Sequence, residues 1–127
     1  MINTIVAIAA GGAIGAMARH GVHNALLIVF GDGFPWGTMI ANIVGSFLMG
    51  VLITWFANIW QPSHAIKLFL ITGCLGAFTT FSSFSLDFVS LLERSAFLNT
   101  FIYLSGSVIM SIGALFAGLS LIRLWVS

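Results

Sequence analysis

The chain has 127 residues, of which 60% are hydrophobic and 6% are charged, and its formal net charge is +1. A typical soluble domain is about 25% charged, because polar side chains must cover its surface, so this composition excludes an ordinary soluble enzyme and a disordered segment. The small net charge excludes a nucleic-acid binder, and the single cysteine, Cys74, excludes a disulfide framework or a zinc site built on several thiolates. The chain is predicted to be an integral membrane protein with a single domain over residues 1–127.

Four apolar stretches are predicted to cross the membrane as helices, each crossing needing roughly 20 residues. The first covers residues 3–18 and ends at Arg19, and the second covers residues 36–60 after a turn-rich segment. The third covers residues 65–92, and the fourth covers residues 97–124. The first stretch lacks the positive n-region of a signal peptide, so we expect it to be retained. The expected fold class is therefore an all-α membrane protein with four transmembrane helices.

Small residues occur in every one of these stretches, as in helices that pack closely within a bilayer. Gly11 and Gly15 form a GxxxG pair on the first stretch. We expect most of these small residues to serve contacts within one chain, and some to serve a contact between two chains.

Basic residues are divided equally between the two sides of the membrane. With four spans, both termini and the loop between the second and third spans share one side with Lys67 and Arg123, whereas Arg19 and Arg94 lie on the other. The positive-inside rule then favours neither orientation. This predicts dual topology, which allows an antiparallel homodimer. An orientation set by a partner protein or by the N-terminal helix is the alternative.

Polar side chains recur every four residues inside the second and fourth stretches, and residues four apart lie on one face of a helix. The two stripes are Thr38, Asn42 and Ser46 on the second stretch, and Tyr103, Ser107 and Ser111 on the fourth. Serine in a membrane helix often bonds only to its own i−4 carbonyl, and this remains the alternative for any single hydroxyl here. The Asn42 amide cannot satisfy all its groups on its own helix, so it must face another helix, water or a solute.

The third stretch contains the segment Phe78-Thr79-Thr80-Phe81-Ser82-Ser83-Phe84-Ser85, with five hydroxyls in eight residues. Phe81 and Phe84 are spaced i, i+3 and can share a face. Gly76 and the Thr79-Thr80 pair make a poor continuous helix, so we expect the third helix to be broken near mid-membrane, with carbonyls free to bind a monovalent cation. An unbroken but kinked helix is the alternative.

These side chains favour the passage of a small anion. A cation path normally offers carboxylates or rings of carbonyls, but the only acid within the four stretches is Asp87, late in the third. The lining offers instead the Asn42 amide, several hydroxyl donors, and the positive ring edges of Phe81 and Phe84. Arg19 is positioned to attract an anion toward a vestibule. Such a path needs no covalent chemistry, so we predict a channel and no enzyme.

Three segments of the chain resemble the CrcB or Fluc family of small four-helix fluoride channels. They are GGAIGAMAR at residues 11–19, GTMIANIVGSF at residues 37–47 and GAFTTFSSFS at residues 76–85. The resemblance extends over nearly the whole chain. It implies an antiparallel, dual-topology homodimer with two pores in the inner (plasma) membrane. Such a dimer would pass fluoride passively down its electrochemical gradient and so keep cytoplasmic fluoride low.

The resemblance and the polar stripes together give a set of candidate site residues. The expected anion pathway consists of Asn42, Phe81, Phe84, Tyr103, Ser107, Thr38, Ser82, Ser111 and Arg19. The resemblance also implies a structural sodium ion (Na+) at the dimer interface, held by the backbone carbonyls of Gly76 and Thr79. The expected partners are a second copy of the chain, the fluoride ion and the lipid bilayer, with no nucleic acid.

Two other classes of protein share some of these features. A small multidrug–proton antiporter also has four short spans and dual topology, but it needs a membrane-embedded carboxylate, for which Asp87 is the only candidate. A non-transporting membrane assembly subunit would not need Asn42 or the two polar stripes.

Overall fold

The computed structural model describes all of residues 1–127 and contains only helices and their connections. Its seven helical elements are α1 (Ile2–Phe30), α2 (Trp36–Asn58), α3 (His64–Lys67), the π-helix η1 (Leu68–Leu75), α4 (Gly76–Phe78), α5 (Phe81–Glu93) and α6 (Phe97–Val126). Four stretches are long and apolar enough to span a membrane, and they are α1, α2, the run His64–Glu93 from α3 to α5, and α6. The prediction of an all-α fold with four membrane-spanning helices is confirmed.

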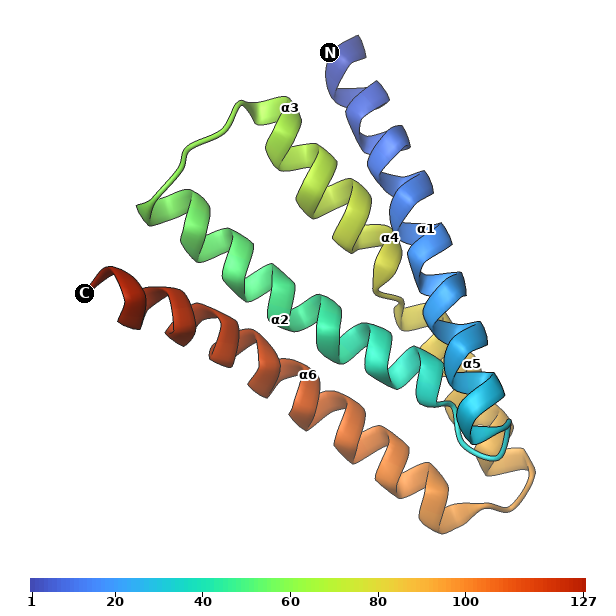
Figure 1. The fold of residues 1–127 in the computed structure, drawn as a ribbon. Helices are drawn as coiled ribbons and strands as arrows, with labels where there is room; N and C mark the ends of the chain where they lie inside the picture. The colour runs from blue at the N-terminus through green and yellow to red at the C-terminus, as the bar shows by residue number, and fades with distance from the viewer.

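The helices pack mainly as two pairs. α2 and α6 run side by side along their length, and α1 lies along η1 and α4 (Figure 1). The two pairs converge at the end of the molecule that carries the α1–α2 and α5–α6 connections, while both termini and the α2–α3 connection lie away from that end (Figure 1). This arrangement agrees with the even number of spans predicted from the sequence.

The first helix is longer than its apolar stretch predicted. We expected the span to end at residue 18, but α1 continues through Arg19 to Phe30. Hydropathy marks only the part that can lie in hydrocarbon, whereas a helix continues until its backbone is interrupted. Here the interruption is Gly31, whose φ of 78° lies in the left-handed region that glycine adopts without steric cost.

Several glycines allow the helix backbones to approach closely. A Cβ on Gly15 would overlap the carbonyl of Cys74 in η1, and a Cβ on Gly118 of α6 would overlap the carbonyl of Phe47 in α2. Close approach of this kind gives the dispersion contacts that hold helices together in lipid. The GxxxG pair predicted on the first span therefore serves a contact within one chain, because Gly11 faces the backbone of Phe69 in the same way.

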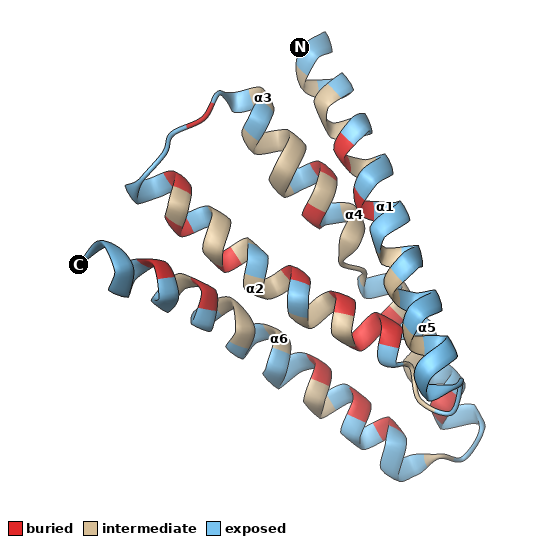
Figure 2. Ribbon diagram, in the orientation of Figure 1, coloured by how far each residue is buried: buried red, intermediate tan, exposed pale blue.

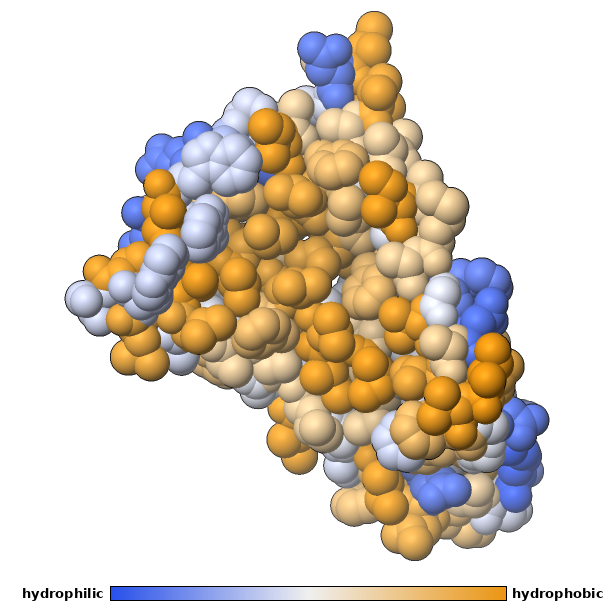
Figure 3. Space-filling model, viewed as in Figure 1, coloured by the Kyte–Doolittle hydropathy of each residue, from blue (hydrophilic) through white to orange (hydrophobic).

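Few side chains are buried inside the single chain, and the outer surface is largely apolar. Only 20 of the 127 residues are buried, with α2 contributing the largest share (Figure 2). On the face shown in Figure 3, apolar residues fill the middle and hydrophilic residues gather toward the ends. The Trp55 and Trp125 rings stack with centroids 5.5 Å apart at one end of the α2–α6 pair, where an interfacial aromatic belt is expected.

Two residues of the third span have extended backbone. Thr79 follows α4 with φ −86° and ψ 156°, and Thr80 precedes α5 with φ −154° and ψ 124°. The Thr79 N–H still donates to the Leu75 carbonyl at 3.0 Å, but the Thr80 N–H and the carbonyls of both residues have no backbone partner. These three polar groups therefore need partners elsewhere.

Candidate functional site

A groove of about 440 Å³ lies between α2, the Thr79–Thr80 pair, the start of α5, and α6. No charged residue lines it. Its polar lining residues are Asn42, Ser46, Thr79, Thr80, Ser107 and Ser111, and Phe81 and Phe84 contribute aromatic rings. Members of both predicted polar stripes and the phenylalanine pair therefore meet in one groove.

Asn42 makes two hydrogen bonds to the backbone of Thr80. Its Oδ1 accepts from the Thr80 N–H at 2.8 Å, and its Nδ2 donates to the Thr80 carbonyl at 3.0 Å. Because Thr80 is extended, its N–H and its carbonyl are both free of the third span's own helices and available to Asn42. The amide has two N–H hydrogens, so one is left over in a side chain that lines the groove. The prediction that Asn42 must face another helix, water or a solute is confirmed.

Two serines of α6 that line the groove have buried hydroxyls without a hydrogen-bond partner. They are Ser107 and Ser111. Other hydroxyls in the chain bond to their own i−4 carbonyl, as Thr79 does to Leu75 and Ser85 to Phe81. An unpaired buried hydroxyl costs about 1–3 kcal/mol. Ser107 and Ser111 both line the groove, so their unpaired hydroxyls are candidates to bind a solute there.

The two phenylalanines of the groove lie one turn apart at the start of α5. The Phe81 and Phe84 ring centroids are 5.6 Å apart and tilted by 42°, so the prediction that they share a face is confirmed. Phe84 is buried against the ring of Tyr103, with centroids 5.2 Å apart, whereas Phe81 is 78% exposed in the single chain. Phe84 thus has a packing role inside the chain, and Phe81 has none of comparable extent.

Three further predicted pathway residues lie beside the groove and do not line it. Tyr103 is fully buried, and its hydroxyl donates to Asp87 Oδ2 at 3.1 Å. Thr38 is buried on α2, and Ser82 is exposed with its hydroxyl 3.4 Å from that of Thr80. The contact between Tyr103 and Asp87 was not predicted, because no periodic pattern connects residues on separate helices.

Arg19 also lies outside the lining of the groove, and it is half-buried between α1 and the third span. Its Nε donates to the Ala77 carbonyl at 3.1 Å, and a terminal nitrogen donates to Ser83 Oγ at 3.3 Å. In a continuous helix the Ala77 carbonyl would accept a hydrogen bond from the N–H of Phe81. The extended Thr79–Thr80 pair between these two residues prevents that bond, so the carbonyl is available to Arg19. No local pattern in the chain signals either contact of Arg19.

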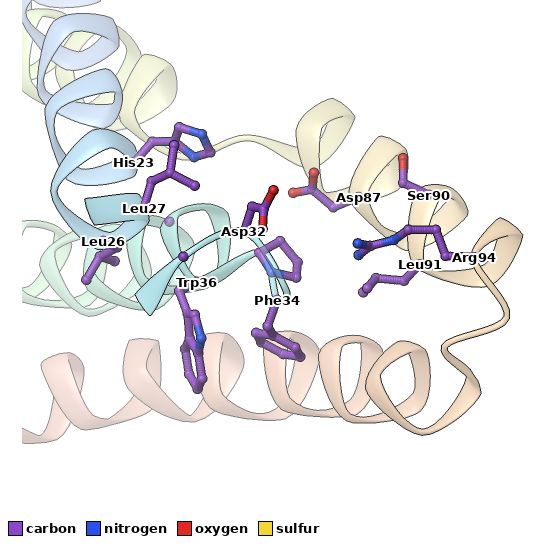
Figure 4. Close-up of a pocket in the computed structure, with 13 residues that line it drawn as sticks. His23, Leu26, Leu27, Asp32, Phe34, Trp36, Asp87, Ser90, Leu91 and Arg94 are labelled. Carbon is purple, nitrogen blue, oxygen red and sulfur yellow. The ribbon is translucent and has the colours of Figure 1, made fainter. Parts of the chain in front are cut away.

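A second cavity of about 240 Å³ lies beneath the α1–α2 connection (Figure 4). Its charged side chains are Asp32, Asp87 and Arg94, and His23 lies at its other side. In Figure 4, Asp87 and Arg94 both point toward the connection that carries Asp32. Two carboxylates make this cavity less favourable for an anion than the groove, which has none.

Four membrane-spanning helices around a groove lined by amide, hydroxyl and aromatic groups define a small multi-pass membrane protein with a candidate solute pathway. The family model described as "CrcB-like protein, Camphor Resistance (CrcB)" matches residues 6–119. The chain therefore belongs to the CrcB-like family, as its three sequence segments predicted.

Curated relatives match the chain over nearly its full length. It is 49% identical to the fluoride-specific ion channel FluC of Rhodospirillum centenum over 122 residues, which are 96% of this chain and 97% of that protein. It is 51% identical to the FluC channel of Agrobacterium fabrum over 123 residues, covering 97% and 98% of the two chains. It is 45% identical to the FluC channel of Cereibacter sphaeroides over 127 residues, which cover both chains completely.

Proposed function

We propose that this chain is a fluoride-specific ion channel, which lets fluoride leave the cell passively down its electrochemical gradient and so lowers cytoplasmic fluoride. Relatives that carry this name match 96–100% of the chain, and they are channels, not enzymes. The structural observation that carries the proposal is the pair of unpaired hydroxyls, of Ser107 and Ser111, in a groove without carboxylates.

The proposed pathway replaces the water around fluoride with uncharged donors. The free N–H of Asn42, the hydroxyls of Ser107 and Ser111, and the ring edges of Phe81 and Phe84 would contact the ion. Such donors bind an anion firmly enough to admit it and weakly enough to release it. The proposed pathway has four further members, which lie outside the lining of the groove. They are Tyr103, Thr38, Ser82 and Arg19.

The decisive experiment compares fluoride and chloride efflux from liposomes that contain the purified chain, at one pH on both sides. We expect rapid fluoride efflux and chloride efflux no faster than from empty liposomes. Fluoride efflux that required a proton gradient would favour the antiporter instead. A preparation that is folded but passes neither ion would favour the non-transporting assembly subunit.

Replacing Ser107 or Ser111 by alanine is expected to slow fluoride efflux by about tenfold, because each change removes a donor worth about 1.5 kcal/mol to a charged ion. The thermal stability should stay the same or rise, since neither hydroxyl has a partner in the folded chain. Ser120→Ala is the matched control, because Ser120 is an exposed serine of the same helix outside the groove. Equal efflux in all three variants would remove the α6 serines from the pathway.

We also propose that the extended Thr79–Thr80 pair breaks the third span near mid-membrane, and that a structural sodium ion binds there between two copies of the chain. The Thr79 carbonyl accepts no hydrogen bond from backbone or side chain, which fits a ligand for such an ion, since unwound carbonyls coordinate sodium in other membrane proteins. The carbonyls of Gly76 and Thr79 would hold the ion. It would supply a fixed positive charge beside the pathway.

Removal of sodium is expected to weaken the assembly of two chains and to lower fluoride efflux, because the free carbonyls would lose their partner. The protein is purified and reconstituted with sodium replaced by N-methylglucamine, and its oligomeric state and efflux are then measured. Returning sodium should restore both. Full assembly and full efflux without sodium would contradict the proposed ion site.

The proposed assembly is an antiparallel homodimer of dual topology in the inner membrane. Two basic residues, Lys67 and Arg123, are expected on one side of the membrane and two, Arg19 and Arg94, on the other. This equal number supports insertion in both orientations. The largely apolar surface of the single chain supports a partner that covers part of it. Reporters that are active on opposite sides of the membrane, each fused to the C-terminus, should both give signal. Signal from one reporter alone would contradict dual topology.

A further inference from the structure

The extended pair leaves three backbone groups of the third span to be satisfied by side chains from other helices. The N–H and the carbonyl of Thr80 are both bonded by Asn42 of α2, at 2.8 and 3.0 Å. The Ala77 carbonyl, which precedes the pair, is bonded by Nε of Arg19 of α1 at 3.1 Å. Backbone groups without such partners would be costly in a bilayer, where no bulk water replaces them.

Arg19 differs from Asn42 because it contacts both sides of the extended pair. Its Nε bonds to Ala77 in α4, and its terminal nitrogen bonds to the hydroxyl of Ser83 in α5, 3.3 Å away. Ser83 lies between Phe81 and Phe84 in the first turn of α5. One rigid guanidinium therefore connects the end of α4 to the turn that carries both phenylalanines.

We infer that Arg19 is a positioning residue of the pathway: its guanidinium bridges α4 and α5 and holds the Phe81–Phe84 pair at the groove. This inference rests on the proposed function. The bridge uses two nitrogens of one planar group at the same time, which the single ammonium of lysine does not reproduce. A residue that only attracts anions to a vestibule needs its positive charge alone. Lysine can therefore replace arginine in attracting anions but cannot replace it in the bridge.

Arg19→Lys separates these roles. We expect its fluoride efflux to fall by about tenfold, as for the loss of a charge-assisted hydrogen bond, and to be no better than that of Arg19→Gln. The matched control is Arg123→Lys, because Arg123 is exposed near the end of α6 and its side chain makes no hydrogen bond. Wild-type efflux in Arg19→Lys would overturn the inference and leave attraction by charge as the role of Arg19.

Hydrogen exchange of residues 79–85, followed by mass spectrometry, tests the bridge without any measurement of transport. We expect amides of this segment to exchange at least about fivefold faster in Arg19→Lys than in Arg123→Lys, since the local structure opens more often. Unchanged exchange would overturn the bridge. If the wild-type chain passed no fluoride, the proposed function would fail, and the exchange result would still decide whether Arg19 holds this segment.

Ser83→Ala provides the second variant, because it removes one end of the bridge and keeps Arg19. Exchange of residues 79–85 and fluoride efflux should both change in the same direction as in Arg19→Lys, by about threefold for a single neutral partner. The change should be absent when Ser83→Ala is added to Arg19→Lys, since coupled residues are not additive. Independent, additive effects of the two substitutions would contradict the bridge. If Arg19→Lys does not fold, Ser83→Ala alone is the test, and wild-type exchange of residues 79–85 in that variant would contradict the bridge.

Discussion

Asn42→Ala is expected to lower fluoride efflux by about 100-fold or more. The change leaves the N–H and the carbonyl of Thr80 without the partners they have at 2.8 and 3.0 Å, and each unpaired group costs about 1–3 kcal/mol. It also removes the second N–H of an amide that lines the groove. About 1.4 kcal/mol corresponds to a tenfold change in rate, so loss of the donor and displacement of the segment that carries Phe81, at about tenfold each, together give about 100-fold. Efflux from liposomes measures the effect.

Asn58→Ala is the matched control for Asn42→Ala. Asn58 is also on α2, but it bonds only to the Thr54 carbonyl of its own helix, at 2.9 Å, and it does not line the groove. We expect its efflux to match that of the wild type. Asn42→Asp should fail as Asn42→Ala does, because it keeps an acceptor for the Thr80 N–H but loses both donors and adds a negative charge. Wild-type efflux in Asn42→Ala would show that the pathway does not depend on this amide.

The membrane spans could be predicted from the sequence because the bilayer itself imposes a length of apolar chain. All four predicted stretches correspond to helices of the structure. The end of the first helix was predicted wrongly, at residue 18 instead of Phe30. Apolar side chains are needed only inside hydrocarbon, whereas the backbone at Gly31 determines where the helix stops.

The groove could be predicted in part, because residues four apart share a helix face whatever they pack against. Periodicity alone identified Asn42, Ser107 and Ser111 as members of polar faces, and the structure brings all three to one groove. The partners of Asn42 and Arg19 could not be predicted in this way. These contacts join residues 38 and 58 positions apart in the chain, and no local pattern encodes which helices become neighbours.

The density of hydroxyls in the third span gave a misleading impression of how many donors are free. Thr79 and Ser85 bond to their own i−4 carbonyls, and the Thr80 hydroxyl accepts from the Ser83 N–H at the start of α5. The unpaired hydroxyls are instead on α6, where serines are sparse. Local side-chain bonds to the backbone therefore use most of the hydroxyl cluster to support the extended segment, and the free donors come from a helix that faces it.

Phe81→Leu is expected to lower fluoride efflux by about tenfold with little loss of stability. The side chain is 78% exposed in the single chain and contacts the Phe84 ring with centroids 5.6 Å apart. Leucine keeps an apolar side chain but has no positive ring edge, and edge interactions between aromatic pairs are worth about 0.5–1.5 kcal/mol beyond their buried area. Efflux and the thermal midpoint of unfolding, measured on the same preparation, separate the two effects. Phe101→Leu is the control, since Phe101 is 68% exposed on α6 outside the groove.

Phe84→Ala should behave differently, because Phe84 is only 8% exposed and packs against the fully buried Tyr103. Removing a buried phenylalanine typically costs about 3–5 kcal/mol, so both stability and efflux should fall. The contrast between the two positions is the informative result. If Phe81→Leu conducts fluoride like the wild type, ring edges at this position do not solvate the ion. If it lowers stability as far as Phe84→Ala does, Phe81 is a packing residue, and the pathway must rely on the amide and the serine hydroxyls alone.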